Sequence, residues 1–352
     1  MSQYWSDLVQ NLDPYVPGEQ PKDKTYIKLN TNENPYPPSP HVVAAIKQAA
    51  NENLRLYPTP TCNELRTTIA HYHGLKAEQI FVGNGSDELL AFSFLAFFNP
   101  DSAILFPDIT YSFYPVYCAL FRIDYTLVPL DEEFSIPTEK FLQENGGIIF
   151  PNPNAPTGKS LGLQSIAKIA EHNKDQVVII DEAYIDFGGE SAVKLIEHYP
   201  NLLIIQTLSK SRSLAGLRVG FAMGHKDLIE ALDRVKNSIN SYTLDRIALA
   251  GALESFKDEG YFQDARQKVI ATREKTALRL ETMGFYIIPS KANFIFISHP
   301  SISAERLYQQ LREKGILVRY FNKARIDNFL RVSIGTEEEM EHLIQRVTEI
   351  VT

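Results

Sequence analysis

The sequence predicts an α/β protein with a large, doubly wound domain, built on a mostly parallel sheet of seven strands. A smaller α+β domain and an N-terminal arm complete it. Three observations support this prediction. Apolar runs of strand length alternate with helical patterns between residues 80 and 223. Polar side chains follow directly after most of these runs. Beyond Gly284 the pattern changes to short strands mixed with helices, which is typical of a separate α+β unit.

The first 40 residues are predicted to form an extended arm. Prolines at seven positions between 14 and 40 keep its backbone extended or turning. The stretch Lys28–Pro35 is dense in short polar side chains, which stabilise turns. It is therefore either a surface linker or a polar loop that lines a cleft. Helices are expected at about 41–51 and 64–73, and Gly74 ends the second.

The seven strands of the large sheet are predicted from short apolar runs. Their approximate ranges are 79–82, 102–106, 124–128, 147–150, 176–180, 202–206 and 218–223. The run at 176–180 is nearly continuous in apolar residues, as expected for a parallel strand that is covered on both faces. Helices are expected at Leu89–Phe98, which is apolar enough to be buried, and at 163–172. In such a sheet, ligands bind outside the carboxyl ends of the strands.

After the seventh strand the pattern becomes helical and then mixed. Residues 226–285 show a mostly helical pattern. Short strands are expected at 286–288, 293–297, 317–319 and 329–333, with helices at about 303–314 and 337–351. The predicted divisions are 1–50 (the arm and the start of the small domain), 51–250 (the large domain) and 251–352 (the C-terminal small domain).

Composition excludes several classes of protein. The formal net charge of -8 argues against bulk binding to nucleic acid or to an anionic membrane. With only Cys62 and Cys118, the chain has neither a disulfide framework nor a thiolate metal cluster, and no metal site is predicted. The first residues lack the pattern of a signal peptide, and Leu89–Phe98 is too short to span a membrane. We therefore expect a cytoplasmic protein with two buried, reduced cysteines.

Lys210 is the centre of the candidate chemistry. It lies in a polar loop directly after the strand at 202–206, eight positions before Arg218. A desolvated lysine loses part of its preference for the charged form, and a neutral amine can bind a carbonyl carbon as a Schiff base. The hydroxyls of Thr207, Ser209 and Ser211, with the Arg218 guanidinium, would suit a phosphate nearby. The alternative is an ordinary surface loop with a solvated lysine.

Further candidates also follow predicted strands: Ser86, Tyr111, Asn154, Asp181 and Tyr184. The glycine-rich turn before Ser86 opens a helix whose free amides form an anion site. Asp181 closes an apolar strand, and a buried carboxylate needs a partner. That partner is either a local cap or ion pair, or the protonated pyridine nitrogen of a cofactor. Each residue also has a purely structural interpretation, so the argument depends on their coincidence at strand ends.

Six stretches of the chain match one protein family. They are Asn11–Tyr15, Leu29–Pro35, Gly85–Glu88, Asp181–Tyr184, Ser209–Lys210 with Leu214–Arg218, and Leu330–Thr336. From end to end the chain resembles the fold-type I pyridoxal-phosphate aminotransferases, and more closely the histidinol-phosphate aminotransferase family. The lysine and aspartate motifs are specific for the fold type, whereas the arm, the Tyr15 region and the Arg331 region point to the narrower family.

The resemblance implies that the large domain binds pyridoxal 5'-phosphate. Lys210 would form the Schiff base with the cofactor, Asp181 would hold the ring nitrogen, and Tyr184 the phenolate oxygen. Tyr111 would stack on the ring. The phosphate would be bound by the amides of Ser86 and Asp87, by Ser209 and by Arg218. The catalytic residues would be Lys210, Asp181 and Tyr184.

The resemblance also implies a homodimer with shared active sites. Tyr57 would reach the cofactor and substrate in the neighbouring subunit. The other substrate-binding residues would be Tyr15, Asn32, Arg319 and Arg331. Arg331 stands between apolar neighbours, where an arginine usually has an anionic partner.

This chain departs from the family pattern at one important position. Many relatives have an asparagine directly before Pro-Thr-Gly that bonds the phenolate oxygen, but here that position is Ala155 and the asparagine is Asn154. Either Asn154 reaches into the site or Tyr184 does this work alone. Pro37 also replaces an expected glycine in the arm, with a local effect.

The activity implied is transfer of an amino group from L-histidinol phosphate to 2-oxoglutarate, giving imidazole acetol phosphate and L-glutamate, in histidine biosynthesis. Two alternatives on the same scaffold are an aromatic-amino-acid aminotransferase and a threonine-phosphate decarboxylase. A non-catalytic, DNA-binding regulator with this fold is a further alternative. It would need a separate basic domain, and the net charge of -8 argues against it.

Overall fold

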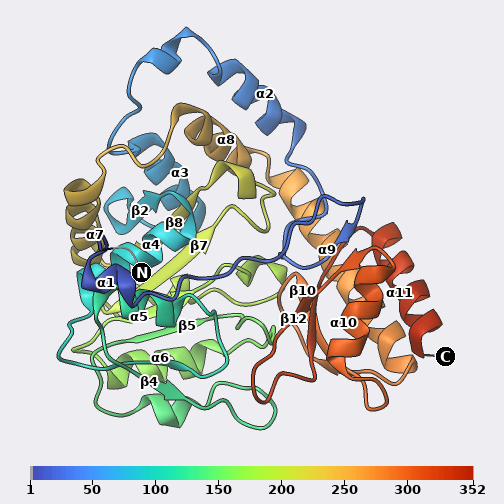
Figure 1. The fold of residues 1–352 in the computed structure, drawn as a ribbon. Helices are drawn as coiled ribbons and strands as arrows, with labels where there is room; N and C mark the ends of the chain where they lie inside the picture. The colour runs from blue at the N-terminus through green and yellow to red at the C-terminus, as the bar shows by residue number, and fades with distance from the viewer. Residues whose placement is uncertain (1–2, 352) are drawn as a thin grey trace.

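The structure is a computed structural model that describes residues 3–351. Its large sheet has seven strands: β2 (Ile80–Gly83), β3 (Ile104–Pro107), β4 (Tyr125–Val128), β5 (Ile148–Pro151), β6 (Val178–Asp181), β7 (Leu202–Thr207) and β8 (Gly220–Gly224). They lie in the order β2-β8-β7-β6-β5-β3-β4, and only β8 pairs antiparallel with its neighbours. The predicted fold class and all seven strands are confirmed (Figure 1).

The helices of the described residues are α1 (Asp7–Gln10), α2 (Pro40–Ala49), α3 (Asn63–His73), α4 (Gly85–Phe97), α5 (Tyr114–Phe121), α6 (Leu163–His172), α7 (Lys226–Ile239), α8 (Arg246–Lys257), α9 (Glu259–Thr282), α10 (Ala304–Glu313) and α11 (Glu337–Val351). Gly74 ends α3 with a φ of 69°, because glycine adopts a left-handed conformation without steric cost. No helix in residues 3–351 is long and apolar enough to cross a membrane.

Helices cover both faces of the large sheet, which explains its apolar strands. In β5, Ile149 packs into one core with residues of α4, α5 and α7, whereas Ile148 and Phe150 pack into a second core with residues of α3, α6 and α8. Successive side chains of a strand point to opposite faces, so a strand buried on both faces has no polar positions to alternate. Cys62 and Cys118 are buried and unpaired, as predicted.

The smaller sheet is antiparallel and has the order β12-β13-β10-β9. Its strands are β9 (Tyr286–Ile288), β10 (Phe294–Ser298), β12 (Arg319–Tyr320) and β13 (Leu330–Ser333). The single strand expected at 317–319 is divided instead. Its first part belongs to β11 (Ile316–Leu317), which pairs in parallel with β1 (Ile27–Lys28) of the arm, and Arg319 begins β12.

Sequence reasoning missed α5 and β1. Helix α5 has only eight residues and is rich in aromatic and apolar side chains, so it shows no amphipathic pattern. Strand β1 has two residues, and its partner lies almost at the other end of the chain. The predicted domain boundary at residue 250 falls inside α8, which packs closely on α2 and α3, so the division stays a prediction.

The arm connects the two parts of the molecule. In Figure 1 the dark blue chain begins on the side of the large domain, crosses to the small sheet and returns to α2. It is anchored on the small domain where β1 pairs with β11. The arm therefore passes directly over the region where the strands of the large sheet end.

Candidate active site

One cavity of about 230 Å³ lies between the carboxyl ends of the large-sheet strands, the small sheet and the arm. Sequence reasoning named fourteen site residues, and twelve of them line this cavity: Tyr15, Asn32, Ser86, Asp87, Tyr111, Asp181, Tyr184, Ser209, Lys210, Arg218, Arg319 and Arg331. Their collection at one edge follows from the parallel sheet, whose strands end together there. Tyr57 and Asn154 do not line the cavity.

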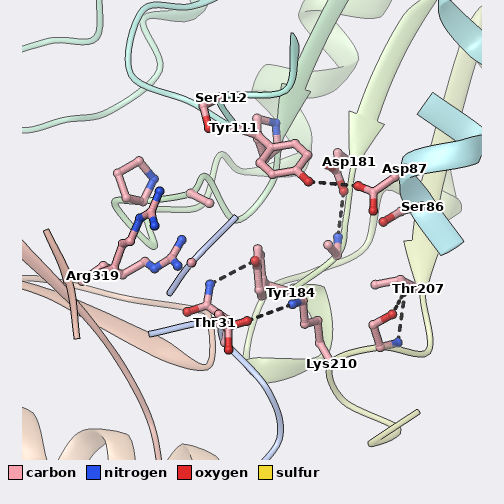
Figure 2. Close-up of a pocket in the computed structure, with 18 of the residues that line it drawn as sticks. Thr31, Ser86, Asp87, Tyr111, Ser112, Asp181, Tyr184, Thr207, Lys210 and Arg319 are labelled. Carbon is pink, nitrogen blue, oxygen red and sulfur yellow. Dashed lines mark hydrogen bonds between the residues drawn. The ribbon is translucent and has the colours of Figure 1, made fainter. Parts of the chain in front are cut away.

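Lys210 follows β7, and its side chain projects into the cavity (Figure 2). Its Nζ is 3.4 Å from the carbonyl oxygen of Thr31 and 5.7 Å from the centre of the Tyr184 ring. The backbone of the loop is held by Asn34, whose amide donates to the carbonyls of Lys210 and Ser211 at 3.0 and 3.1 Å. The Lys210 amine therefore has only a weak hydrogen bond, whereas the backbone of its loop is held firmly. The amine can react without disrupting the fold.

Asp181 is a buried carboxylate that forms no ion pair with any residue of 3–351. It closes β6 and is only 5% exposed. Burial raises its pKa to about 6, while the amide of Ala183 at 3.1 Å and the hydroxyl of Tyr114 at 3.4 Å oppose that shift by donating hydrogen bonds. A buried carboxylate held in this way is suited to a cation that enters the cavity.

The N-terminus of α4 forms a cradle for an anion. The first turn of a helix leaves its amides without intrahelical partners, and here these include the amides of Ser86 and Asp87. Arg218 lies beside them, with Nη2 3.0 Å from Asp87 Oδ2 and Nη1 3.4 Å from Ser209 Oγ. Free amides, a helix dipole and a guanidinium together favour a phosphate group.

Two glycines make this cradle possible. Gly85 has a φ of +78°, and a Cβ there would lie 2.5 Å from Arg218 Nη2. A Cβ on Gly220 of β8 would lie 2.7 Å from the backbone nitrogen of Ser86. Strand β8 and the start of α4 are therefore packed backbone against backbone.

Replacing Gly220 by alanine is expected to weaken phosphate binding. The new methyl group meets backbone atoms, which cannot rotate away, so α4 must shift and its amides lose their alignment. Overpacking of this kind costs about 1–3 kcal/mol, and we expect affinity for a phosphate-bearing ligand at this cradle to fall by roughly tenfold. Pyridoxal phosphate, which the sequence resemblance implies, is the ligand to titrate by fluorescence. Gly260→Ala is the matched control, because nothing lies within 4 Å of its added Cβ, and an equal loss in both variants would contradict the prediction.

Tyr111 lies on the large-domain side of the cavity. Its hydroxyl donates to Asp87 Oδ1 at 2.9 Å, and burial raises its pKa, so the hydroxyl keeps its proton. The Tyr114 ring meets it edge-on, with centroids 5.8 Å apart. The Tyr111 ring is thereby fixed with one face on the cavity, as Figure 2 shows.

Tyr184 meets a partner that sequence reasoning did not assign to it. Asn32 Nδ2 donates to the Tyr184 hydroxyl at 3.0 Å. Asn32 is in turn fixed by Ser333, whose Oγ accepts from its backbone nitrogen and donates to its Oδ1, both at 2.8 Å. An asparagine amide from the arm therefore lies beside the tyrosine, although no residue pattern near Tyr184 indicates it.

Asn154 lies behind the cavity rather than in it. It is 1% exposed, its Nδ2 donates to the Ile109 carbonyl at 2.9 Å, and its Oδ1 accepts from Thr110 Oγ1 at 3.3 Å. These bonds use its side chain to support the loop before Tyr111. The alternative in which Tyr184 acts without Asn154 agrees better with this position.

Arg319 and Arg331 form a cationic end of the cavity. They are directly opposite each other in the β12–β13 pair. Arg331 Nη2 donates to the Asn30 carbonyl at 3.0 Å, but its buried Nε has no partner, and burial lowers its pKa. Within residues 3–351, neither arginine forms an ion pair with a carboxylate. Two such guanidiniums facing a cavity are suited to an anionic ligand.

Tyr57 is on the surface. It is 77% exposed, and its ring stacks on Tyr242 with centroids 4.6 Å apart. It contributes nothing to the cavity of its own chain.

Several cavity residues were not predicted, among them Gly18, Asn30, Thr31 and Phe321. Asn30 and Thr31 belong to the polar arm stretch that was interpreted as a possible cleft lining, whereas Gly18 and Phe321 carry no chemical signal.

The chain was compared with known proteins. A model of the family "Aminotransferase class I and II" matches residues 24–347. The chain is 63% identical to a histidinol-phosphate aminotransferase of Clostridium acetobutylicum over 351 residues, covering 100% of both chains. It is 59% identical to that of Clostridium beijerinckii, covering 100% of this chain and 98% of the relative.

Solved structures show the same fold. The histidinol-phosphate aminotransferase of Sinorhizobium meliloti in complex with pyridoxal-5'-phosphate has a TM-score of 0.90 at 22% identity, covering 100% of this chain and 98% of the other. A putative histidinol-phosphate aminotransferase of Erwinia carotovora atroseptica has a TM-score of 0.85 at 25% identity, covering 92% of this chain and 95% of the other. With the family match over most of its length, the chain belongs to the class I and II aminotransferases.

Proposed function

We propose that this enzyme transfers the amino group of L-histidinol phosphate to 2-oxoglutarate, using pyridoxal 5'-phosphate. The observation that carries the proposal is that one cavity is lined by Lys210 and Asp181 and also by Arg319 and Arg331, which form no ion pair with a carboxylate of residues 3–351. The relatives at 59–63% identity, which are histidinol-phosphate aminotransferases, support the choice of substrate.

The residues present fit the cofactor. Asp181 is a buried carboxylate that lacks a cation, and a protonated pyridine nitrogen is one. The Ser86 and Asp87 amides with Arg218 form a phosphate cradle. Gly85 and Gly220 carry no Cβ, which would otherwise collide with Arg218 and with the Ser86 backbone. The Tyr111 ring offers a flat face between these two ends.

When bound, pyridoxal phosphate supplies an electron sink for the bond that breaks at the substrate carbon. Lys210 would hold the cofactor through its aldehyde carbon, and once the substrate amine displaces it, its Nζ would act as general base and then as general acid. It would take the proton from the substrate carbon that bears the amine and return it to the carbon on the other side of that nitrogen. Asp181 would keep the ring nitrogen protonated, and Tyr184, with Asn32 beside it at 3.0 Å, would stabilise the phenolate oxygen.

The two arginines explain how one cavity accepts two substrates. Histidinol phosphate carries its phosphate on the carbon next to the one that bears the amine, and 2-oxoglutarate carries a carboxylate directly on its keto carbon. A guanidinium binds either anion through paired N–H groups, so Arg331 and Arg319 can serve both half-reactions. The arm residue Tyr15 lines the same end.

We also propose a cytoplasmic homodimer with shared sites. Tyr57 is too exposed for a role in its own chain. Its ring stacks on the exposed Tyr242, and Leu54 and Leu56, which are close to it in sequence, are exposed as well, as is Ile239, close to Tyr242. Exposed apolar patches often mark interfaces. Light scattering on the purified protein measures the assembly, and a monomer at micromolar concentration would contradict the proposal.

A single-turnover absorbance experiment tests the activity. The cofactor-loaded enzyme is mixed with histidinol phosphate alone, and we expect the absorbance band of the bound cofactor to be lost and then restored by 2-oxoglutarate. Loss of the band only with aromatic amino acids would replace the substrate by that of the aromatic aminotransferases. Release of carbon dioxide from threonine phosphate would identify the decarboxylase instead.

A further inference from the structure

One wall of the cavity comes from the arm. Tyr15, Pro17 and Gly18 line it beside Arg319, although about 300 residues separate them in sequence. Residues 3–26 of the arm form no strand that pairs with a sheet. Some other contact must therefore fix the position of this wall.

Two attachments hold the segment, one on each side of the cavity. On the large-domain side, the Tyr15 ring stacks on Phe113 with centroids 4.6 Å apart and planes inclined by 26°. On the small-domain side, the Glu19 carboxylate accepts from the Tyr308 hydroxyl at 2.8 Å and from Arg312 Nε at 3.1 Å, both on α10. The wall is therefore held at one end by the stacked rings of Tyr15 and Phe113, and at the other by the hydrogen bonds of the Glu19 carboxylate, which we call the Glu19 contacts.

The backbone next to Glu19 is closely packed against the rest of the cavity wall. A Cβ on Gly18 would lie 2.8 Å from Thr31 Cγ2 and 3.8 Å from Arg319 Nη1. The residue next to Glu19 therefore lies almost in contact with the arginine that faces the ligand. Glu19 is tied once more through its own carbonyl, which accepts from Asn30 Nδ2 at 2.9 Å. Arg331 donates to the carbonyl of that same Asn30 at 3.0 Å.

We propose that Glu19 is a positioning residue for the anionic end of the substrate. Through Tyr308 and Arg312 it fixes the Tyr15–Gly18 wall against Arg319, and thereby sets how tightly the cavity encloses a phosphate or carboxylate. Glu19 does not line the cavity itself. The inference rests on the proposed function only for the identity of the substrate.

A purely structural role makes a different prediction. A partly exposed ion pair contributes little to global stability, and its loss would change substrate affinity no more than the loss of a similar pair elsewhere. Glu349 provides that comparison. The Glu349 side chain is 36% exposed, against 32% for that of Glu19. Glu349 forms ion pairs with Lys314 and Arg346 at 2.8 and 2.7 Å, and both of these partners lie outside the arm.

The test measures KM and kcat for histidinol phosphate in Glu19→Ala, Glu19→Gln and the control Glu349→Gln, all loaded with cofactor. We expect Glu19→Ala to raise KM by about tenfold and Glu19→Gln, which keeps an acceptor for Tyr308, by about threefold. We expect kcat and cofactor occupancy to stay within about twofold. Arg312→Ala should raise KM too, and the double variant with Glu19→Ala should be no worse than Glu19→Ala.

A second readout does not depend on turnover. Lys24 is an exposed arm residue, so tryptic cleavage there, followed by mass spectrometry, reports opening of the arm. Inorganic phosphate, as a probe of the arginine end, should slow this cleavage in the wild type and less in Glu19→Ala. Unchanged KM and cleavage in Glu19→Ala would overturn the inference, as would equal losses in the Glu349→Gln control. Failure of the wild type to use histidinol phosphate, with phosphate protection intact, would overturn only the proposed substrate.

Discussion

Replacing Lys210 by alanine is expected to abolish turnover while the protein stays folded. The side chain has one weak polar contact, 3.4 Å from the Thr31 carbonyl, and the loop backbone is held by Asn34 instead. Its removal therefore costs little stability. It does remove both the nucleophile and the proton carrier, and general acid–base catalysis alone contributes roughly 10²–10⁴ in rate. We expect kcat to fall by at least about 10⁴.

Two measurements separate this effect from loss of the cofactor. Borohydride reduction followed by mass spectrometry should find the cofactor mass on the Lys210 peptide of the wild type and on no peptide of the variant. Cofactor affinity should fall much less than kcat, because the Asp181 and Arg218 contacts remain. Lys194→Ala, which removes an exposed lysine whose ion pair is with Glu190, is the control. Transamination at the wild-type rate by Lys210→Ala would remove the lysine from the mechanism.

The strand ends were predictable because local pattern and chemistry coincide there. A run such as Val177–Ile180 indicates a buried strand, and a charged residue directly after it must lie at the sheet edge. The same reasoning placed Lys210 after β7, and the structure brings both side chains to one cavity. In a parallel sheet, residues that follow different strands lie at the same edge, so side chains far apart in sequence become neighbours.

Contacts between distant segments were not predictable in this way. Asn32 meets Tyr184 across 152 positions and Ser333 across 301, and no period or motif encodes either pairing. Asn154 shows the opposite failure. Its position after a strand indicated the cavity, but the turn that follows directs its side chain to the Ile109 carbonyl. A one-residue offset in a tight loop changes the direction of a side chain, which sequence position alone does not reveal.

Replacing Asp181 by asparagine is expected to give the second largest loss of activity. The amide keeps the size of the carboxylate but not its charge, so a protonated ring nitrogen would lose its counter-ion inside a buried site. Removal of one preorganised electrostatic partner typically costs 10²–10³ in kcat, and we expect roughly 10³. Tyr114→Phe, which removes a donor 3.4 Å from the carboxylate but leaves its charge, should cost much less. Equal losses in the two variants would contradict the role of the charge.

The pH dependence of cofactor binding provides an independent signature of Asp181. In the cofactor-free protein, burial raises the Asp181 pKa from 3.8 to about 6. A carboxyl group with a raised pKa binds an extra proton in the folded state, so its contribution to stability falls as pH rises between about 4 and 6. A cation beside the carboxylate reverses this penalty. The increase in Tm on cofactor binding should therefore be larger at pH 8 than at pH 5.

Two other titrations must be separated from that of Asp181. Burial also raises the pKa of Glu182 to about 7, but this carboxyl is bonded by Ser191, Ala192 and Gln206 rather than exposed to the cavity. Its effect cancels between loaded and cofactor-free protein. The cofactor phosphate titrates near pH 6 as well, yet it does so equally in Asp181→Asn. The difference in Tm gain between wild type and Asp181→Asn should therefore grow through pH 6. A difference that stays constant with pH would mean that the Asp181 carboxylate does not pair with the bound ring nitrogen.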